Sequence, residues 1–407
     1  MPANASFDAQ FLNIPIRSLY ISGGVFPVVV REAAVKRGNA AHDTVELSVL
    51  VQGEMTFDGK VRIPLDEKDT TAGTRDVATE SLEGQPVSFV YGVSPWVETF
   101  YGYIMSVTPD QKFKQGLNYV ISMSGSTLFC QQVNRRFYTN QTDTELVQRV
   151  ADRASLGFIT NTTTSYRWPS LGVTTQTDWE LASALTNRAG CLLFNWGGVI
   201  RMVDPMVLFK EYPFTTLTSS DDLLETDRKL MDFKPTSRTV NQIATRPLEF
   251  FFFDRDGQVV SFQQTKAGYH GPLLPYSQSP VLSREEAEIF GKSMENSTSR
   301  WLHNATARIK GDASIYPGVT VNVNTGTKEA TAKFNGRWLV MAVSHSMKRD
   351  AFNTELTLTR PGDTIPALTK PTFDHFWRAS DKPRPVLYLR DTRWFSSWAN
   401  PYVEVLT

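Results

Sequence analysis

The sequence shows no excess of charge of either sign, because Lys and Arg together number 42 and Asp and Glu together also number 42. A chain of balanced charge creates no overall field that would attract nucleic acid or an anionic membrane surface. Long hydrophobic runs are missing as well, and no stretch approaches the roughly 18 consecutive apolar residues of a membrane-spanning helix. These absences argue against a DNA-binding enzyme and exclude a membrane-spanning helix.

Cysteine is scarce, since Cys130 and Cys191 are the only two in the sequence. Neither has a second cysteine nearby, so neither a thiolate metal site nor a redox pair is predicted. We interpret both as reduced, packed thiols of a protein that folds in a cytosol. The segment Met1 to Gln10 agrees with this, because it is polar and holds neither the basic nor the apolar part of a secretory signal.

Residue patterns that carry chemistry are also missing. The sequence has five histidines: His42, His270, His303, His345 and His375. No two have the short spacing that metal sites use, and we expect His345 to be a hydrogen-bonded residue within a strand. The adjacent carboxylates Asp221-Asp222 and Glu285-Glu286 fall at turn and helix-start positions, where acids are expected for backbone reasons. The sequence therefore predicts no catalytic residue, no cofactor site and no metal site.

What is present is a globular composition, with 41% hydrophobic and 21% charged residues and a length suited to two or three domains. The first part, residues 1–125, is rich in predicted strands. Thr44 to Val49 alternates polar and apolar residues, which is typical of a sheet with one buried face. Asp58-Gly59 between apolar residues predicts a hairpin. Further strands are expected at 87–91, 100–107 and 118–123.

The pattern changes in residues 126–205, where two helices are predicted. Thr142 with Glu145, and Thr177 with Glu180, each form the Thr-x-x-Glu pattern of a capping box. Gly157 and Gly190 are the expected helix ends. A hairpin turned by Gly197-Gly198 should follow, so this part is predicted to be a small α/β module inserted between strand-rich regions.

Strands return in residues 206–365. Phe250 to Phe253 and Val259 to Gln264 predict a hairpin, and Ser283-x-x-Glu286 should cap a third helix that runs toward Trp301. The closing strands are expected at 305–310, 320–324, 338–344 and 353–359.

An internal repeat links the first and third parts. Two segments share one pattern: Gly84-x-x-Val87-x-Phe89-x-x-Gly92 and Gly318-x-x-Val321-x-Val323-x-x-Gly326. The next glycines, Gly102 and Gly336, also match, and the strands that follow are displaced by about two residues. Glycines between strands could agree by chance in any β-protein. We nevertheless predict that regions 15–125 and 225–362 are two copies of one barrel.

Several strand and turn segments, taken in order, resemble the hub proteins of phage tail baseplates, the late control D proteins and the hub part of type VI secretion spike proteins. The resemblance covers residues 15 to 362 and rests on these stretches: Gly102 to Ile104, Tyr119 to Ser122, Thr144 to Leu146, Thr177 to Gly190, Ile309 to Val323, Gly336 to His345 and Phe352 to Leu358. Spike proteins continue into a long β-helix, and this sequence does not.

The resemblance implies a mainly β fold of two related β-barrels of hub or tail-tube type with the α/β insertion between them. It implies a non-enzymatic baseplate hub subunit, assembled in the bacterial host cytoplasm, that forms a homotrimer around a channel for passing DNA. Three such chains would present six similar barrels, so one ring could adapt a sixfold tail tube or distal tail protein to a threefold spike or tip. The alternatives are a tail-associated cell-wall hydrolase and a peripheral receptor-binding tail protein.

Residues 366–407 differ from the rest because they combine five prolines with many aromatic side chains. Disordered tails rarely hold so many aromatics, so we predict an arm that anchors on another chain. The alternative is a tail that folds back on its own barrel. The candidate partner-binding residues are Trp377, Tyr388, Trp394, Phe395, Trp398 and Tyr402.

Overall fold

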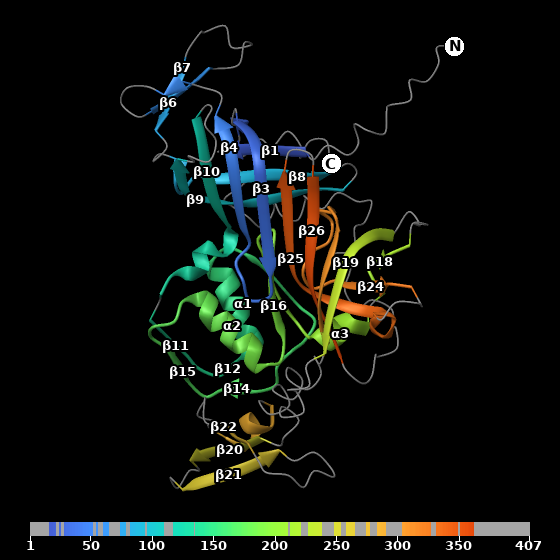
Figure 1. Ribbon diagram of the computed structural model, residues 1–407. Helices are drawn as coiled ribbons and strands as arrows, with labels where there is room; N and C mark the ends of the chain where they lie inside the picture. The colour runs from blue at the N-terminus through green and yellow to red at the C-terminus, as the bar shows by residue number, and fades with distance from the viewer. Residues whose placement is uncertain are drawn as a thin grey trace, which may run out of the picture.

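The computed structural model of the chain describes residues 16–361, except for residues 22–23, 26–27, 52–53, 56–59, 65–73, 79–81, 94–95, 110–116, 134, 211, 221–226, 238–247, 254–257, 265–273, 277–282, 290–302, 327–330 and 349–350. Two barrels and a helical module make up the body of the molecule (Figure 1). The predicted fold class, mainly β with two related barrels and an α/β insertion, is confirmed.

The first barrel is an antiparallel sheet in the order β1-β8-β9-β10-β4-β3. Its strands are β1 (Ile16–Ile21), β3 (Val28–Gly38), β4 (Thr44–Val51), β8 (Pro86–Val93), β9 (Trp96–Pro109) and β10 (Leu117–Gly125), with the short β2 (Gly24–Val25) beside β1. At the seam between β1 and β3, the Arg17 Nη1 group donates to the Arg31 carbonyl oxygen over 2.8 Å. A separate small sheet of β5 (Glu54–Met55), β6 (Lys60–Pro64) and β7 (Thr74–Ala78) projects from this barrel (Figure 1).

The module follows the first barrel. Its helices are α1 (Asp143–Arg153), α2 (Asp178–Arg188) and α3 (Pro205–Lys210), preceded by a 3₁₀ turn at Ser126–Gln131. Its strands are β11 (Arg136–Tyr138), β12 (Gln141–Thr142), β13 (Gly157–Thr160), β14 (Arg167–Trp168), β15 (Leu171–Val173), β16 (Leu192–Trp196) and β17 (Val199–Val203). Both predicted capping boxes are present, at Thr142 and Thr177.

The second barrel is closed, because β25 pairs with both β24 and β26. Its strands are β18 (Thr215–Thr218), β19 (Asp227–Ser237), β23 (His303–Lys310), β24 (Thr320–Asn324), β25 (Gly336–Lys348) and β26 (Ala351–Arg360). Between β19 and β23 the chain forms the sheet of β20 (Leu248–Phe253), β21 (Val259–Gln264) and β22 (Leu274–Tyr276), followed by a helical turn at 284–289. This lobe lies beyond the module, at the opposite end from the β5–β7 sheet (Figure 1).

The two barrels share one strand order. Counted along the chain, the six strands of each barrel are hydrogen-bonded in the order first, fourth, fifth, sixth, third, second. Matching glycines stand two residues before the fourth strand: Gly84 N donates to Ile104 O over 2.8 Å, and Gly318 N donates to Val340 O over 2.8 Å. Their φ angles of 76° and 93° are left-handed, which explains why glycine is needed at both places. One difference is that β18 pairs with β24 in parallel, whereas β1 and β8 are antiparallel.

Bulges also recur at corresponding positions. In the first barrel the register shifts at Arg31 in β3 and at Met105 in β9, and in the second it shifts at Met231 in β19 and at Met341 in β25. A bulge adds one residue to one strand and bends it locally. Two bulges on equivalent strands of each barrel support the interpretation that the barrels are copies of one another.

Three apolar cores lie inside these parts. The core of the first barrel is completed by Met347 and Phe352 of the second barrel, so the two barrels pack against each other. The second core surrounds Trp338. The core of the module lies under α1 and α2 and includes Cys130 and Cys191, which are buried, and burial raises the pKa of both thiols to about 12. Within the described residues, no helix has both the length and the apolar character needed to cross a bilayer.

Candidate assembly interface

The two barrels are joined by hydrogen bonding between β3 and β25. This joint runs in antiparallel register from Ala33 opposite Met347 to Gly38 opposite Ala342. One step further, Asn39 N donates to Met341 O over 3.0 Å. Through this joint and the β25–β26 pairing, eight strands form one continuous antiparallel sheet in the order β9-β10-β4-β3-β25-β26-β23-β19. The interface of interest is this shared sheet.

One face of the shared sheet packs on the barrel cores, and the other carries polar side chains. On β4, for example, Val45, Leu47 and Val49 are buried, whereas Thr44 and Glu46, which alternate with them, are exposed. The alternation follows from the two-residue period of a strand. We call the exposed side the polar face; it includes Lys36, Thr44, Glu46, Asp232, Lys234, Thr306, Arg308, Lys310, Ser346, Lys348 and Glu355.

Charges of opposite sign alternate across the polar face. A single row of residues that stand opposite one another runs through Lys36, Ser344, Glu355, Arg308 and Asp232. At the Asp232 end of this row, Lys234 Nζ lies 2.7 Å from Asp232 Oδ2. That hydrogen bond raises the pKa of Lys234 and lowers the pKa of Asp232. The polar face thus has both signs of charge in close mixture.

Beneath the joint lies a buried group of charged side chains from three parts of the chain. Arg37 Nε of β3 lies 3.4 Å from Asp43 Oδ2, and Arg201 of β17 acts on the same carboxylate. Burial raises the pKa of Asp43 to about 7, although both arginines oppose the rise. On β25, His345 Nδ1 lies 2.9 Å from Thr354 Oγ1, and burial together with Arg37 lowers the pKa of His345 to about 3. His345 is therefore a hydrogen-bonded sheet residue, as predicted.

The shared sheet ends in two strands with open outer sides. We call residues 105–109 of β9 the β9 edge and residues 231–237 of β19 the β19 edge. Within the described residues, no strand pairs with the outer side of either. Each edge carries an exposed methionine at its bulge, since Met105 is 45% exposed and Met231 is 56% exposed. Unpaired edges with exposed apolar side chains are places where another chain can pair.

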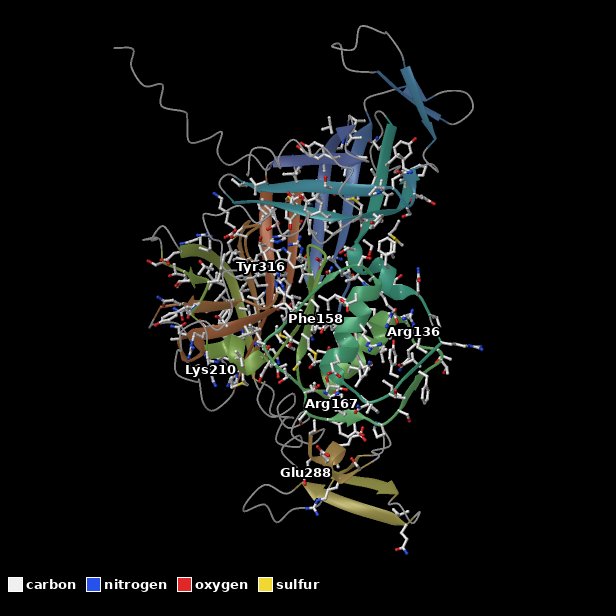
Figure 2. The ribbon with its side chains drawn as sticks, turned by 180° about the vertical axis from the view of Figure 1, so that it is seen from behind. Arg136, Phe158, Arg167, Lys210, Glu288 and Tyr316 are labelled. Carbon is white, nitrogen blue, oxygen red and sulfur yellow. The ribbon has the colours of Figure 1, made fainter. Side chains whose placement is uncertain are left out.

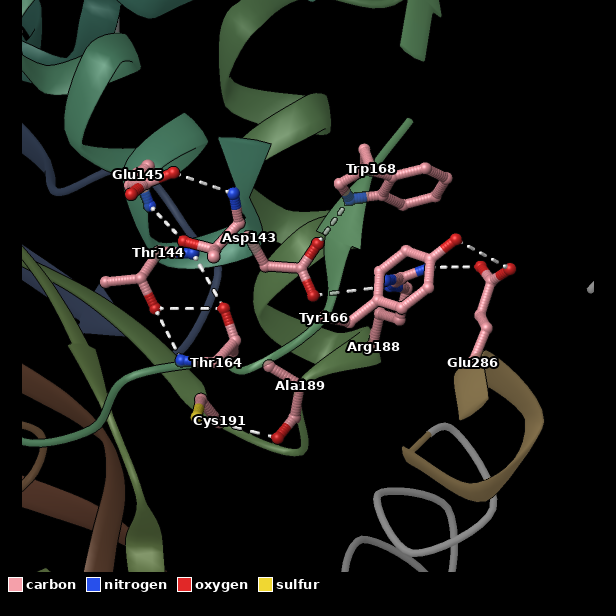
Figure 3. A network of polar contacts seen from close by, with 11 residues as sticks. Asp143, Thr144, Glu145, Thr164, Tyr166, Trp168, Arg188, Ala189, Cys191 and Glu286 are labelled. Carbon is pink, nitrogen blue, oxygen red and sulfur yellow. Dashed lines mark hydrogen bonds and ion pairs between the residues drawn. The ribbon is translucent and has the colours of Figure 1, made fainter. Parts of the chain in front are cut away.

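A second polar network holds the 283–289 segment on the module (Figure 3). Arg188 at the end of α2 forms ion pairs with Asp143 and with Glu286. Its guanidinium lies 3.9 Å from the ring centre of Trp168 and 4.7 Å from that of Tyr166. Burial raises the pKa of Asp143, while Arg188 and a hydrogen bond from Trp168 oppose this.

Glu286 does not complete a capping box. Ser283 accepts a hydrogen bond from the Glu286 backbone N–H, as the sequence predicts, but the Glu286 carboxylate pairs with Arg188 and accepts from the Tyr166 hydroxyl. The neighbouring Glu288, labelled in Figure 2, lies where the chain meets the β20–β22 lobe. The network thus fixes the base of the lobe to the module.

The predicted partner-binding residues lie outside the described residues: Trp377, Tyr388, Trp394, Phe395, Trp398 and Tyr402. Asp221 and Asp222 lie outside them too. Sequence reasoning missed the Arg37–Asp43–Arg201 group, the Arg188 network and both edges. The only signal that pointed to the edges was the repeat, because it identifies which strands should behave alike.

Neither a protein-family model nor a curated protein sequence matches the chain. Among solved structures, the 43 kDa tail protein of prophage MuSo2 from Shewanella oneidensis is similar with a TM-score of 0.58 and 14% identity, over 85% of this chain and 98% of that chain. A tail protein from Neisseria meningitidis matches with a TM-score of 0.58 and 13% identity, over 86% of this chain and 98% of that chain.

A third similar structure is the Escherichia coli c3393 protein, a component of the type VI secretion system that is itself described as similar to tail proteins of bacteriophage T4. Its TM-score is 0.55 at 14% identity, over 86% of this chain and 79% of that chain. At these identities the likeness concerns the fold, and it agrees with the resemblance predicted from the sequence. The chain therefore has the fold of phage tail proteins and of a type VI secretion component.

Proposed function

We propose that this chain is a structural hub subunit of a phage-type tail baseplate, and that three copies form a ring around a central channel. The observation that carries the proposal is the shared sheet, in which two copies of one barrel are already joined side by side through β3 and β25. Repeating that joint between chains would continue the sheet around a closed ring. Three chains would then contribute six similar barrels.

The polar face is the side of the sheet that would line the channel. Its charges are mixed in sign, with Lys36, Glu355, Arg308 and Asp232 in one row. A strongly basic surface would bind DNA phosphates tightly, because each neutralised phosphate releases counterions. A surface of mixed charge supports the passage of DNA without sequence-specific binding.

Six similar barrels within a threefold ring suit a position between components of different symmetry. We propose a hexameric tail tube or distal tail protein on one side and a trimeric spike or tip protein on the other, in a virion tail assembled in the host cytoplasm. The type VI secretion component with the same fold supports a place in an injection machine. The C-terminal arm, residues 366–407, would anchor on a neighbouring chain through its Trp and Tyr residues.

The proposal includes no catalysis, in contrast to a tail-associated cell-wall hydrolase. Among the described residues of the pairs Asp221-Asp222 and Glu285-Glu286, Glu286 is buried. Its carboxylate pairs with the Arg188 guanidinium. A buried carboxylate that is occupied by a guanidinium and by the Tyr166 hydroxyl does not face a cleft, as the acid of a glycosidase must. Peptidoglycan incubated with the purified chain should therefore release no soluble fragments, and measurable release would support the hydrolase alternative.

The ring is tested by the mass and shape of the purified full-length protein. Native mass spectrometry should show a species of three times the 45.8 kDa chain, and electron microscopy should show a ring with a central hole and six similar lobes. A species that remains monomeric at every concentration, including after mixing with the tail tube protein of the same particle, would contradict the ring.

A further inference from the structure

We infer that the β9 edge of one copy lies against the β19 edge of the next copy, in the register that β25 and β3 use within one chain. The inference rests on the proposed ring and adds which strands meet and which residues stand opposite each other. It follows from the internal repeat, because β9 is the copy of β25 and β19 is the copy of β3. Within one chain β25 and β3 are joined, whereas β9 and β19 stand at the two open ends of the sheet.

The equivalence of β9 and β25 can be fixed to the residue. Gly84 N donates to Ile104 O, and the equivalent Gly318 N donates to Val340 O. Ile104 and Val340 therefore occupy equivalent positions. The bulges at Met105 and Met341 follow directly after them. Pro109 in β9 therefore takes the place of His345 in β25.

The equivalence of β19 and β3 is fixed by the bulges at Met231 and Arg31. After each bulge the strand continues beside its neighbour without another shift, so residues 233–237 correspond to residues 33–37. Pro235 in β19 therefore takes the place of Val35 in β3.

The register between copies follows from these equivalences. Within the chain, Val343 stands opposite Arg37, Ser344 opposite Lys36, and His345 opposite Val35. When this register is applied to the two edges, Val107 of one copy stands opposite Ser237 of the next, Thr108 opposite Thr236, and Pro109 opposite Pro235. The exposed Met105 and Met231 lie at the bulges of these same edges, where contact between copies would cover apolar surface.

The two prolines give the joint between copies a property that the joint within the chain does not have. Because Asn39 N donates to Met341 O, and because antiparallel pairs alternate, Val35 and His345 form a hydrogen-bonded pair. Pro109 and Pro235 occupy those places and have no N–H to donate. Each can exist in its strand because that position faces the open side rather than its own barrel. The joint between copies thus lacks two backbone hydrogen bonds and should open more readily.

Disulfide trapping with the full-length chain tests the register. Thr108 and Thr236 are exposed and would form a non-hydrogen-bonded pair, with Cα atoms about 4.5 Å apart, which suits a disulfide. Within one monomer, β9 and β19 lie at opposite ends of the shared sheet, seven strand spacings or roughly 34 Å apart along it, so we expect the disulfide to form between copies. We expect oxidised T108C/T236C protein to run as a covalent trimer on a non-reducing gel.

Controls separate the register from the ring. The S106C/T236C variant places the cysteines two residues out of register and should crosslink at least tenfold less. An equal mixture of T108C and T236C single variants should give covalent dimers, whereas wild-type protein, with Cys130 and Cys191 buried, should give none. A noncovalent trimer with no T108C/T236C crosslink, or with more S106C/T236C crosslink, overturns the register and leaves the ring standing. The absence of any trimer contradicts the ring itself.

Discussion

Asp43 and His345 lie in one buried group at the joint of the two barrels, Arg37 acts on both, and their pKa values are displaced in opposite senses. Asp43 is raised to about 7 and His345 is lowered to about 3. From pH 4 to 6.5 the folded chain holds a proton on Asp43 that the unfolded chain loses. The contribution of this carboxyl to the free energy of unfolding therefore falls as pH rises. Over the same range His345 binds a proton in the unfolded chain but stays neutral when it is buried in the folded chain. The contribution of this imidazole to the free energy of unfolding therefore increases as pH rises.

The two contributions oppose each other, and removing one should expose the other. Relative to wild type, the unfolding free energy of Asp43→Asn should rise with pH between 4.5 and 6.5, and that of His345→Asn should fall. Each slope difference should reach up to about 1.4 kcal/mol per pH unit. Urea unfolding at several pH values measures both variants. Equal slopes in wild type and both variants would show that these groups do not titrate as their burial indicates.

The ring joint should weaken when its exposed methionines become charged. Met105→Glu or Met231→Glu would place an unpaired charge against the neighbouring copy, and we expect the trimer dissociation constant to rise at least tenfold, which corresponds to about 1.4 kcal/mol. Val259→Glu is a matched control, because Val259 is 64% exposed and lies in the β20–β22 lobe. Analytical ultracentrifugation gives the dissociation constants. An equal effect in all three variants would argue against these edges.

Replacing the two edge prolines should strengthen the ring. Pro109→Val with Pro235→Val restores two N–H donors in each joint between copies, each contributing about 1 kcal/mol net, so each joint should bind roughly 30-fold more tightly and the trimer should gain at least that much. Each single substitution restores one donor and should give an intermediate gain. Mass photometry across a dilution series measures the change. If the double variant dissociates like wild type, the two prolines do not stand opposite each other.

Breaking the Arg188–Glu286 pair should loosen the base of the lobe without unfolding the barrels. Both side chains are nearly buried, at 11% and 6% exposure, so Glu286→Ala leaves a buried cation without this partner and should cost about 3 kcal/mol locally. Hydrogen exchange in residues 283–289 should accelerate while exchange in β25 and β26 stays slow. The matched control is Glu288→Ala, whose exposed pair with Arg284 should contribute less than about 0.5 kcal/mol.

Deleting residues 366–407 tests the arm. Both barrels should keep their thermal unfolding temperature, while attachment of a neighbouring tail component should fail, because the deletion removes the Trp and Tyr side chains that we propose as anchors. Co-purification of the truncated chain with the tail tube or spike protein of the same particle measures attachment. Attachment that survives the deletion would mean that the arm folds back on its own barrel.

Local signals in the sequence predicted local structure well. Thr142 and Thr177 cap their helices as expected, since a capping box depends on residues three positions apart. The predicted stop at Gly157 was wrong: the helix ends earlier, and Ser155 takes the left-handed conformation with a φ of 55°. Glycine prefers that conformation, but packing can impose it on another residue.

The repeat was predicted from its glycines, but one of them was misassigned. Phe89 pairs with Phe100, eleven positions on, whereas its equivalent Val323 pairs with Gly336, thirteen positions on. The connection in the second barrel is therefore two residues longer, and Gly102 corresponds to Trp338 rather than to Gly336. Contacts between distant segments, such as Arg188 with Glu286, left no local pattern and could be seen only in the fold.

Fusing two barrels into one chain changes the entropy of building the proposed ring. Six separate barrels would need five associations between free molecules before the sixth joint closed the ring, and each association costs translational and rotational freedom. With β3 and β25 in the same polypeptide, three of the six joints form at the high effective concentration that a covalent link provides. Only two encounters between chains remain before the last joint closes within the trimer, so joints that lack two hydrogen bonds each can still close the ring. Duplication also lets alternate barrels diverge in sequence, which six identical subunits cannot do.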